Sequence, residues 1–432
     1  MSVTVPFRFL HAADLHLDSP FRGLSKAPAA VRSALEQSTF SALKALTELA
    51  IREEVDFVVV AGDLYDEADS SLRAQLALAR EWSKLHEHGI AVFAIHGNHD
   101  HMGGQRAKLK LPESVHIFGP EAMSGQPAYR RSGELAAYIY GQSYGRRAVT
   151  DNIAASYRPS AEAPFHIALL HANVGGDPSH DAYAPCTLRE LTAGGFHYWA
   201  LGHIHTRAIL HQYPHVVYPG NVQGRHPRET GSRGCYIVDV SRSGDVQLDF
   251  RPLDAVRWIE GAISINGIPD EGELLDKLLE VSYELASRED GRPVMIRLKL
   301  TGEGMLHSKL ADGAILADML ESLQAEHATE EETSAWIFVY ELEQHTREQL
   351  DWRALEEEES FAGEMLRLAG RLQRDEAAWQ SFAREALSSI AAHPKLGHLQ
   401  RGKWNDPSKE WLEQAIRLAV GHIVRHSGAG RE

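Results

Sequence analysis

Cysteine is nearly absent from this chain of 432 residues, which contains only Cys186 and Cys235. Two cysteines cannot form a disulfide framework, so we expect a reducing compartment. Long apolar runs are also missing, because no stretch approaches the ~18 uncharged apolar residues that a membrane span needs. The N-terminus lacks a basic leader followed by an apolar segment and a cleavage site, so no signal peptide is expected. These absences predict a cytoplasmic protein without a membrane segment.

Positive charge is in deficit as well, with 44 lysines and arginines against 60 aspartates and glutamates and a net charge of −16. This balance argues against a broad basic face for nucleic acid. It leaves open a local site at which bound cations supply the positive charge. Histidine is abundant by contrast, with 24 residues, many of them at the ends of apolar runs.

Short apolar runs alternate with helical patterns up to about residue 250, which is typical of an α/β fold. Helices are expected around 28–53 and 69–88, between the first three strands, and this spacing indicates parallel pairing. The predicted strands cover 7–13, 55–62, 90–97, 114–119, 136–141, 165–172, 198–203 and 234–240. We therefore expect one α/β domain over residues 1–252.

A second, smaller α/β domain is expected over residues 253–345. Its predicted strands cover 257–265, 292–300 and 335–342, and its helices cover 271–287 and 306–326. Residues 346–432 have a charged, helical pattern. Within KEWLEQAIRLAVGHIV (409–424), apolar residues recur at three- and four-residue steps and so line one helix face. Such a stripe is buried either in the protein's own core, which is the commoner outcome, or against a partner.

Side chains that commonly bind metals follow five of the predicted strands. They are Asp14, His16, Asp63, Asn98, His171, His203 and His205, and His99 stands next to Asn98. Each of them alone is more often a turn residue or a packed histidine than a ligand. In an open α/β sheet, however, ligands bind outside the carboxyl ends of the strands, where the loops converge. The joint pattern therefore favours one shared site.

The residue types narrow the chemistry of this site. Imidazole, carboxylate and amide oxygen without thiolate suit manganese, iron or zinc. Seven ligands are too many for one tetrahedral zinc, but they fit two ions that share a bridging carboxylate. Two cations roughly 3.5–4 Å apart form the arrangement used for phosphoryl hydrolysis. The predicted reaction is the hydrolysis of phosphate esters.

The motifs also resemble those of a known family. The blocks DLH (14–16), GD (62–63), GNHD (97–100), His171 and GHIH (202–205) are similar, in order, to the five motifs of the calcineurin-like metallophosphoesterases. GDLYD (62–66) and the smaller α/β domain resemble the SbcD-type nucleases and their archaeal and eukaryotic double-strand-break-repair relatives. NVGGD (173–177), YAPCTLREL (183–191), YWALGHIH (198–205) and YPGNVQGRHPRETG (218–231) are most similar to the YhaO-type DNA repair exonucleases. The resemblance implies a two-sheet αββα sandwich, a small α/β DNA-capping domain and a helical C-terminal region.

The resemblance further implies a division of roles among the site residues. The first ion would be held by Asp14, His16, Asp63 and His205. Asp63 would bridge to the second ion, which Asn98, His171 and His203 would complete. The implied metals are two divalent ions, manganese first, with iron or zinc as alternatives.

His99 would face the scissile phosphate, where it would stabilise the transition state or protonate the leaving oxygen. Asp100 would orient His99, and a turn cap is the equal alternative for Asp100. Where the archaeal and eukaryotic relatives have a second functional histidine, three residues after the bridging aspartate, this chain has Asp66. The nucleotide-rotating role of that histidine therefore cannot be transferred. Arg225 and Arg228 are candidates for gripping DNA phosphates, and ordinary salt bridges within their loop are the alternative.

Three functions are compatible with these patterns. The first is a manganese-dependent DNA phosphodiesterase in DNA repair, an exonuclease that also nicks single strands. The second is a phosphoesterase of small phosphomonoesters or cyclic phosphodiesters, and the third is a weakly active regulatory subunit. SbcD-like families dock a C-terminal helical segment on the coiled coil of an SMC-type ATPase. This resemblance implies that residues 346–432 bind such an SbcC-like ATPase and that two copies of each subunit assemble.

Overall fold

The computed structural model describes residues 5–21, 27–67, 70–104, 107, 109–160, 162–176, 183–328, 335–391 and 408–428. By its internal contacts the chain divides into two compact units. The first comprises residues 1–262, 275–299 and 318–343, and the second comprises 263–274, 300–317 and 344–432. The three domains expected from the sequence, over 1–252, 253–345 and 346–432, stay a prediction.

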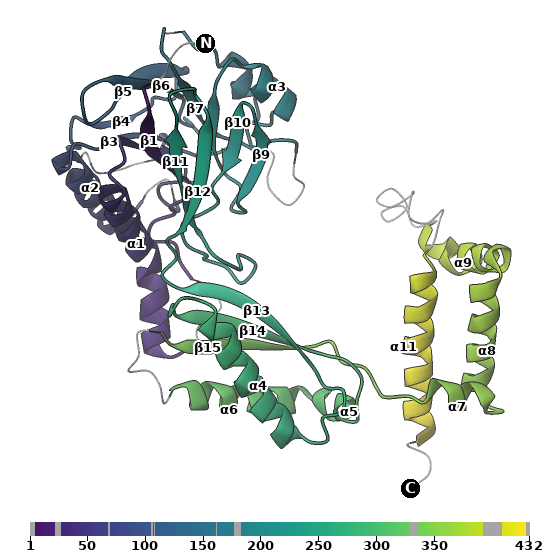
Figure 1. Ribbon diagram of the computed structural model, residues 1–432. Helices are drawn as coiled ribbons and strands as arrows, with labels where there is room; N and C mark the ends of the chain where they lie inside the picture. Colours follow the sequence, from purple (N-terminus) through teal and green to yellow (C-terminus); the bar gives the residue numbers. More distant parts are fainter. Residues whose placement is uncertain are drawn as a thin grey trace. The chain divides into compact units, whose positions relative to one another are not determined.

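Two six-stranded sheets form the centre of the first unit (Figure 1). The first has the order β12 (Val246–Pro252), β11 (Gly234–Val240), β1 (Phe7–Ala12), β2 (Phe57–Ala61), β3 (Ala91–Ile95), β4 (Val115–Ile117). The second has the order β5 (Ser124–Tyr129), β6 (Leu135–Gly141), β7 (His166–His171), β8 (Tyr198–Gly202), β10 (His215–Tyr218), β9 (Ala208–Gln212). The central strands β1 to β3 and β6 to β8 pair in parallel. The carboxyl ends of neighbouring strands therefore lie together.

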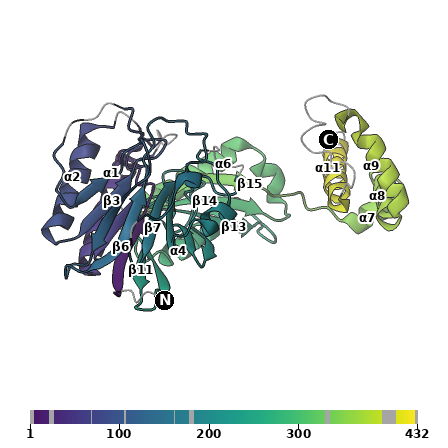
Figure 2. The same ribbon diagram turned by 90° about the horizontal axis from the view of Figure 1, so that it is seen from above.

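The two sheets pack face to face, and helices cover their outer faces. The helices α1 (Ala29–Arg52) and α2 (Leu72–Glu87) lie on the same side of the first sheet (Figures 1 and 2). The helices η1 (Ile153–Ser156) and α3 (Leu188–Ala193) pack on the outer face of the second sheet. Strand β2 contributes Val58 and Val60 to the helix-side core and Phe57 and Val59 to the core between the sheets. A strand buried on both faces must be apolar throughout, and the expected αββα sandwich is confirmed.

A three-stranded sheet follows, in the order β13 (Arg257–Ser264), β14 (Val294–Thr301), β15 (Ile337–Gln344). Its helices are α4 (Glu271–Ser287), α5 (Leu306–Leu310) and α6 (Gly313–Ala328). The strands and α4 agree with the expected mixed α/β pattern, but two helices replace the single helix predicted over 306–326. The reason is a local cap, because the Asp312 carboxylate accepts the Ala314 N–H at 3.0 Å and so starts a new helix.

Four helices are described in the C-terminal region, which was predicted to be helical: α7 (Trp352–Glu357), α8 (Phe361–Arg374), α9 (Glu376–Ala391) and α11 (Lys409–Gly428). Helices α8 and α11 lie side by side (Figure 1). Helices α8, α9 and α11 share a core of Ala369, Leu372, Trp379, Ala383 and Leu412, with Ile416 packed against it. The apolar stripe of 409–424 thus contributes to a core of this chain, which is the alternative to partner docking. Among the described residues, no helix is long and apolar enough to cross a membrane.

Candidate metal centre

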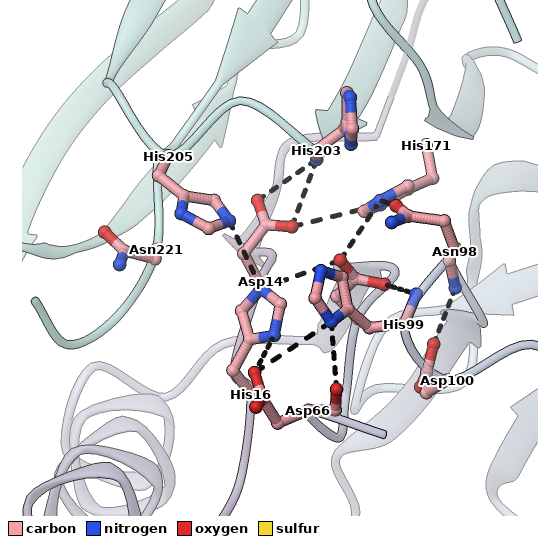
Figure 3. A network of polar contacts seen from close by, with 12 residues as sticks. Asp14, His16, Asp66, Asn98, His99, Asp100, His171, His203, His205 and Asn221 are labelled. Carbon is pink, nitrogen blue, oxygen red and sulfur yellow. Dashed lines mark hydrogen bonds and ion pairs between the residues drawn. The ribbon is translucent and has the colours of Figure 1, made fainter. Parts of the chain in front are cut away.

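The predicted ligands lie at the carboxyl ends of five strands, three of them in the first sheet and two in the second. Figure 3 shows the side chains of Asp14, His16, Asn98, His171 and His205 close together. Asp14 and His16 follow β1, Asp63 follows β2, Asn98 and His99 follow β3, His171 ends β7, and His203 and His205 follow β8. Contacts of 3.0 to 3.9 Å connect the side chains of six predicted ligands: Asp14, His16, Asp63, Asn98, His171 and His205. The fold therefore assembles residues that are up to 191 positions apart, by the difference between 205 and 14.

The backbone of several site residues adopts an uncommon conformation. The φ angles of Asp14, His16, Asp63 and His203 are 54°, 42°, 49° and 94°, all in the left-handed region. This region costs a non-glycine residue on the order of 1–3 kcal/mol. The Asp14 N–H donates to the Gly62 carbonyl at 3.0 Å and the His16 N–H donates to the Asp63 carbonyl at 3.0 Å, which ties the first two loops together. The packed sandwich thus maintains strained turns that aim the ligands at one point.

Glycines permit the close approach of these loops. A Cβ atom at Gly202 would collide with the carbonyl oxygen of Ala61. At Gly97 it would collide with the Asp63 carboxylate and would lie 2.7 Å from Nε2 of His171. The glycines in GNHD and GHIH are therefore required by the space between the loops, beyond their use in turns.

One half of the centre is built around His171 and Asp63. Nδ1 of His171 lies 2.9 Å from the Ala61 carbonyl, which can only accept, so Nδ1 carries a hydrogen. Nε2 lies 3.0 Å from Oδ1 of Asn98 and 3.4 Å from Oδ2 of Asp63. Burial alone would lower the pKa of His171, but the carboxylates of Asp63 and Asp14 outweigh it and raise the pKa to about 9. In the metal-free protein, His171 is therefore protonated on Nε2. This proton faces the oxygen atoms of Asn98 and Asp63, where a metal ion would bind.

The pKa of Asp63 is shifted by the same contacts. Burial alone would raise this pKa, but the nearby imidazoles of His171 and His16 hold it well below its usual range. Asp63 is therefore an ionised carboxylate within the buried interior, and ionised oxygen is the form that binds a metal.

The other half contains two facing imidazoles. The Nε2 atoms of His16 and His205 are only 3.2 Å apart. Nδ1 of His205 lies 2.6 Å from Oε1 of Glu229, and Nδ1 of His16 lies 3.1 Å from Oδ1 of Asp66. The Glu229 carboxylate accepts a hydrogen, so Nδ1 of His205 is its protonated nitrogen and Nε2 of His205 bears a lone pair. Among the described residues, Nδ1 of His16 has no hydrogen-bond partner, so its short distance to Asp66 does not fix the position of the ring hydrogen. The two Nε2 atoms are within hydrogen-bond distance of each other in the metal-free protein, and one cation can bind both of them when Nε2 of His16 is also unprotonated.

The arrangement of the donors fits a pair of divalent ions. The donor atoms form three groups, and within each group all of them lie within 4.8 Å of one another. The groups are Asp14 with His16 and His205, His16 with Asp63 and His99, and Asp14 with Asp63 and His171. Asp14, His16 and Asp63 each belong to two of these groups, and Asp63 is the carboxylate expected to bridge the ions. Among the residues that the structure describes, His203 joins none of these groups. Its backbone N–H donates to the Asp14 carboxylate at 3.1 and 3.2 Å, and its ring packs 5.3 Å from the ring of His171. The part of His203 as a ligand stays a prediction.

His99 differs from the buried ligands in its exposure, because 36% of its side chain is accessible. Its backbone N–H donates to Oδ1 of Asp63 at 3.0 Å, and Nδ1 of its ring lies 2.9 Å from the carbonyl oxygen of Asp66. The Asp100 carboxylate instead accepts the N–H of Gly97 at 2.7 Å and the N–H of Leu64 at 2.9 Å. The structure therefore favours the turn-capping alternative for Asp100, and a backbone carbonyl orients His99.

Glu229 is a site residue that the sequence reasoning missed. Burial alone would raise its pKa, but the hydrogen bond with His205 and the charge of Arg225 hold the pKa below its usual range. The arginines of loop 218–231 suggested DNA binding, but its carboxylate is the residue that reaches the metal centre. This loop follows β10, which pairs in parallel with β8, so a carboxylate in it lies near the ligands that follow β8. The guanidinium of Arg225 contacts Asp66 and Ser19, while Arg228 is exposed. DNA binding by either arginine stays a prediction.

An ionised carboxylate among converging imidazoles, at the strand ends of an αββα sandwich, defines a metal-dependent phosphoesterase. Residues 7–207 match the family of calcineurin-like phosphoesterases, and residues 258–347 match the middle domain of the metallophosphoesterase YhaO. The chain is 43% identical over 329 residues to the uncharacterized metallophosphoesterase YhaO of Bacillus subtilis (strain 168), over 76% of this chain and 79% of that protein. The chain therefore belongs to the calcineurin-like metallophosphoesterases and has the YhaO type of middle domain.

More distant relatives confirm the resemblance to nucleases of the SbcD type. The chain is 26% identical over 296 residues to the DNA double-strand break repair protein Mre11 of Methanopyrus kandleri, over 62% of this chain and 61% of that protein. It is 24% identical over 318 residues to the Mre11 protein of Archaeoglobus fulgidus, over 67% of each chain.

Proposed function

We propose that this chain is a manganese-dependent DNA phosphodiesterase, an exonuclease that also nicks single strands, and that it acts in cytoplasmic DNA repair. The observation that carries the proposal is the convergence of carboxylates and imidazoles from both sheets on Asp63. The choice of DNA as substrate is supported by the similarity to two Mre11 proteins, whose names describe double-strand break repair.

The site residues have distinct parts in this proposal. Two divalent ions would activate a water and stabilise charge on the phosphate oxygens. Their proposed ligands are Asp14, His16, Asp63, Asn98, His171, His203 and His205. His99 is the candidate for proton transfer. Because Nδ1 of His99 donates its hydrogen to the Asp66 carbonyl, Nε2 is the nitrogen that remains for the substrate. In the imidazolium form of the ring, Nε2 carries the second hydrogen, gives it to the leaving oxygen and leaves a neutral ring. Its partial exposure leaves this ring accessible to a substrate, unlike the buried rings of His16 and His171.

The net charge of −16 favours a second candidate, the hydrolysis of small phosphomonoesters or cyclic phosphodiesters. A small substrate needs no extended basic surface, whereas a DNA-binding protein gains much of its affinity from one.

One experiment separates these functions. The metal-stripped protein is incubated with end-labelled duplex and single-stranded DNA, with and without manganese, and with small phosphodiesters alongside. We expect manganese-dependent release of nucleotides from the DNA. Cleavage of the small esters with intact DNA would select the second candidate. Absence of all hydrolysis by the fully metallated protein would select the regulatory subunit.

An SMC-type coiled-coil ATPase is the partner in this proposal, bound by residues 346–432 in an assembly with two copies of each subunit. Large apolar side chains are exposed on these helices, namely Phe361, Leu368, Phe382 and Leu418. An amphipathic helix that leaves such side chains outside its own core is suited to a groove on another protein.

A further inference from the structure

We infer that Arg225 braces the first half of the metal centre by joining two carboxylates, Asp66 and Glu229, that position the ligands His16 and His205. These three residues, Asp66, Arg225 and Glu229, are called the brace below. The inference rests on the two-ion centre of the proposed function, and it gives Arg225 a positioning role in place of a contact with DNA.

The brace fixes which nitrogen of each ligand faces the ions. Oε1 of Glu229 lies 2.6 Å from Nδ1 of His205, and Oδ1 of Asp66 lies 3.1 Å from Nδ1 of His16. The hydrogen bond with Glu229 favours hydrogen on Nδ1 of His205, and the Asp66 carboxylate lies on the Nδ1 side of His16. Both rings thereby turn Nε2 toward the centre, where the two Nε2 atoms are 3.2 Å apart. Carboxylates that hold ligand histidines in this way raise the metal affinity of a site by their orientation of the rings.

Arg225 connects the two carboxylates through different groups. Its guanidinium Nη1 forms an ion pair with Oδ1 of Asp66 and donates to Oγ of Ser19 at 2.9 Å. Its backbone N–H donates to Oε2 of Glu229 at 2.7 Å. Only 14% of the Arg225 side chain is exposed, and 15% of each partner carboxylate. An ion pair with so little solvent access holds its geometry better than a surface pair.

The loop that supplies Arg225 and Glu229 is itself fixed by buried side chains. Nδ2 of Asn221 donates to Oε2 of Glu229 at 3.0 Å. Nε2 of Gln223 donates to the Val256 carbonyl at 2.7 Å, and the indole N–H of Trp258 donates to the Gly224 carbonyl at 3.0 Å. The brace is therefore attached to strand β13 and the segment before it, so its two carboxylates are held before any ion binds.

The second half of the centre relies on the backbone instead. Nδ1 of His171 is held by the carbonyl of Ala61 at 2.9 Å, which no side-chain substitution removes. This asymmetry distinguishes a positioning role from a general effect on folding. Loss of the brace should weaken one ion and leave the other unchanged.

The test is a calorimetric titration of the metal-stripped full chain with manganese. For Arg225→Ala and Glu229→Gln we expect one of the two equivalents to bind roughly 10- to 100-fold more weakly, and the other to bind as in the wild type. Arg225→Lys retains the charge and should recover part of the loss. Arg228→Ala changes an exposed arginine of the same loop and should leave both affinities for manganese unchanged.

Three results would overturn the brace: wild-type affinity of both equivalents in Arg225→Ala and Glu229→Gln, equal weakening of both, or weakening in Arg228→Ala to the same extent. If Arg225→Ala does not fold, the nearly isosteric Glu229→Gln decides. A wild-type protein that binds two manganese ions, one of them dependent on the brace, yet cleaves no DNA would refute the proposed function and leave the brace intact.

Discussion

Charged side chains are usually exposed and large apolar side chains are usually buried. The sandwich and the C-terminal helices depart from this rule in opposite ways. In the sandwich, Asp14, Asp63 and His171 are almost completely buried, and burial of such groups costs free energy unless they are paired. In the C-terminal helices, 68% of Phe361 and 66% of Leu418 are exposed. Buried charge suits the binding of ions, and exposed apolar surface suits the binding of a protein. This difference is in line with the proposal of a metal centre in the sandwich and a partner-docking surface on the C-terminal helices.

The largest effect is expected from Asp63→Asn. Asp63 is the proposed bridging carboxylate, and its side chain contacts His16 in one half of the centre and His171 in the other. Its replacement should therefore remove the second equivalent of metal. Hydrolysis should fall by at least about 10³-fold, since ions at such centres contribute several kcal/mol to transition-state stabilisation. Metal analysis and a rate measurement on the same sample check this expectation. Full occupancy with a wild-type rate would contradict the two-ion assignment.

His99→Ala should have a smaller and more selective effect. The side chain is partly exposed and lies beside the centre, so we expect metal content to be retained while the rate falls by at least ~10²-fold, the usual scale for a positioned proton donor. The same metal analysis and rate measurement apply. Loss of an ion in this variant would instead make His99 a ligand, as its place in the group with His16 and Asp63 permits.

Two glycine substitutions compare the packing of the two units. In Gly202→Ala the new Cβ collides with the Ala61 carbonyl, so we expect a loss of about 1–3 kcal/mol in the free energy of unfolding. At Gly313, the first residue of α6, no described atom lies within 4 Å of the place that a Cβ would take. Gly313→Ala should gain about 0.4–1 kcal/mol, because alanine lowers the conformational entropy of the unfolded chain. Urea denaturation of both variants measures the difference. Equal changes would show that the loops of the centre have room to relax.

The smallest effect on the centre is expected from changes in the C-terminal helices. Truncation near residue 345 should leave the sandwich folded and manganese-dependent hydrolysis unchanged, but should abolish co-purification with the ATPase. Phe361→Ala removes one exposed side chain and should weaken co-purification without a change in melting temperature. Unfolding or aggregation of the truncated protein would show that these helices belong to the core of the whole chain.

The fold could be predicted from the sequence where strands are buried on both faces. A run such as FVVVA in β2 is typical of a central strand. Strands β5, β9, β10 and β12 were not predicted. Strands β5, β9 and β12 have half-buried or exposed positions and include polar residues, and β10 has only four residues. Short or half-exposed strands lack a strong hydrophobic pattern, since their pairing is decided by neighbours far along the chain.

The candidate ligands could be predicted because each follows a recognisable strand. The side chains that contact these ligands and hold them in place could not be predicted. Glu229 lies 24 positions from His205 and Arg225 lies 159 positions from Asp66, and neither spacing repeats in a helix or strand. Asp100 gives the converse case. Its place next to His99 in the sequence suggested that it orients the His99 ring, but the backbone carbonyl of Asp66 makes that contact instead.

The two facing imidazoles of His16 and His205 have a consequence for handling the protein. Nitrogen ligands bind the later divalent metals of the first transition row more tightly than manganese, so zinc and copper compete for this position whenever they are present. Selection of manganese would therefore depend on the supply of metals in the cell and not on affinity alone. Protein isolated from different growth media should carry different ions, and its specific activity should vary with them until the centre is stripped and reloaded.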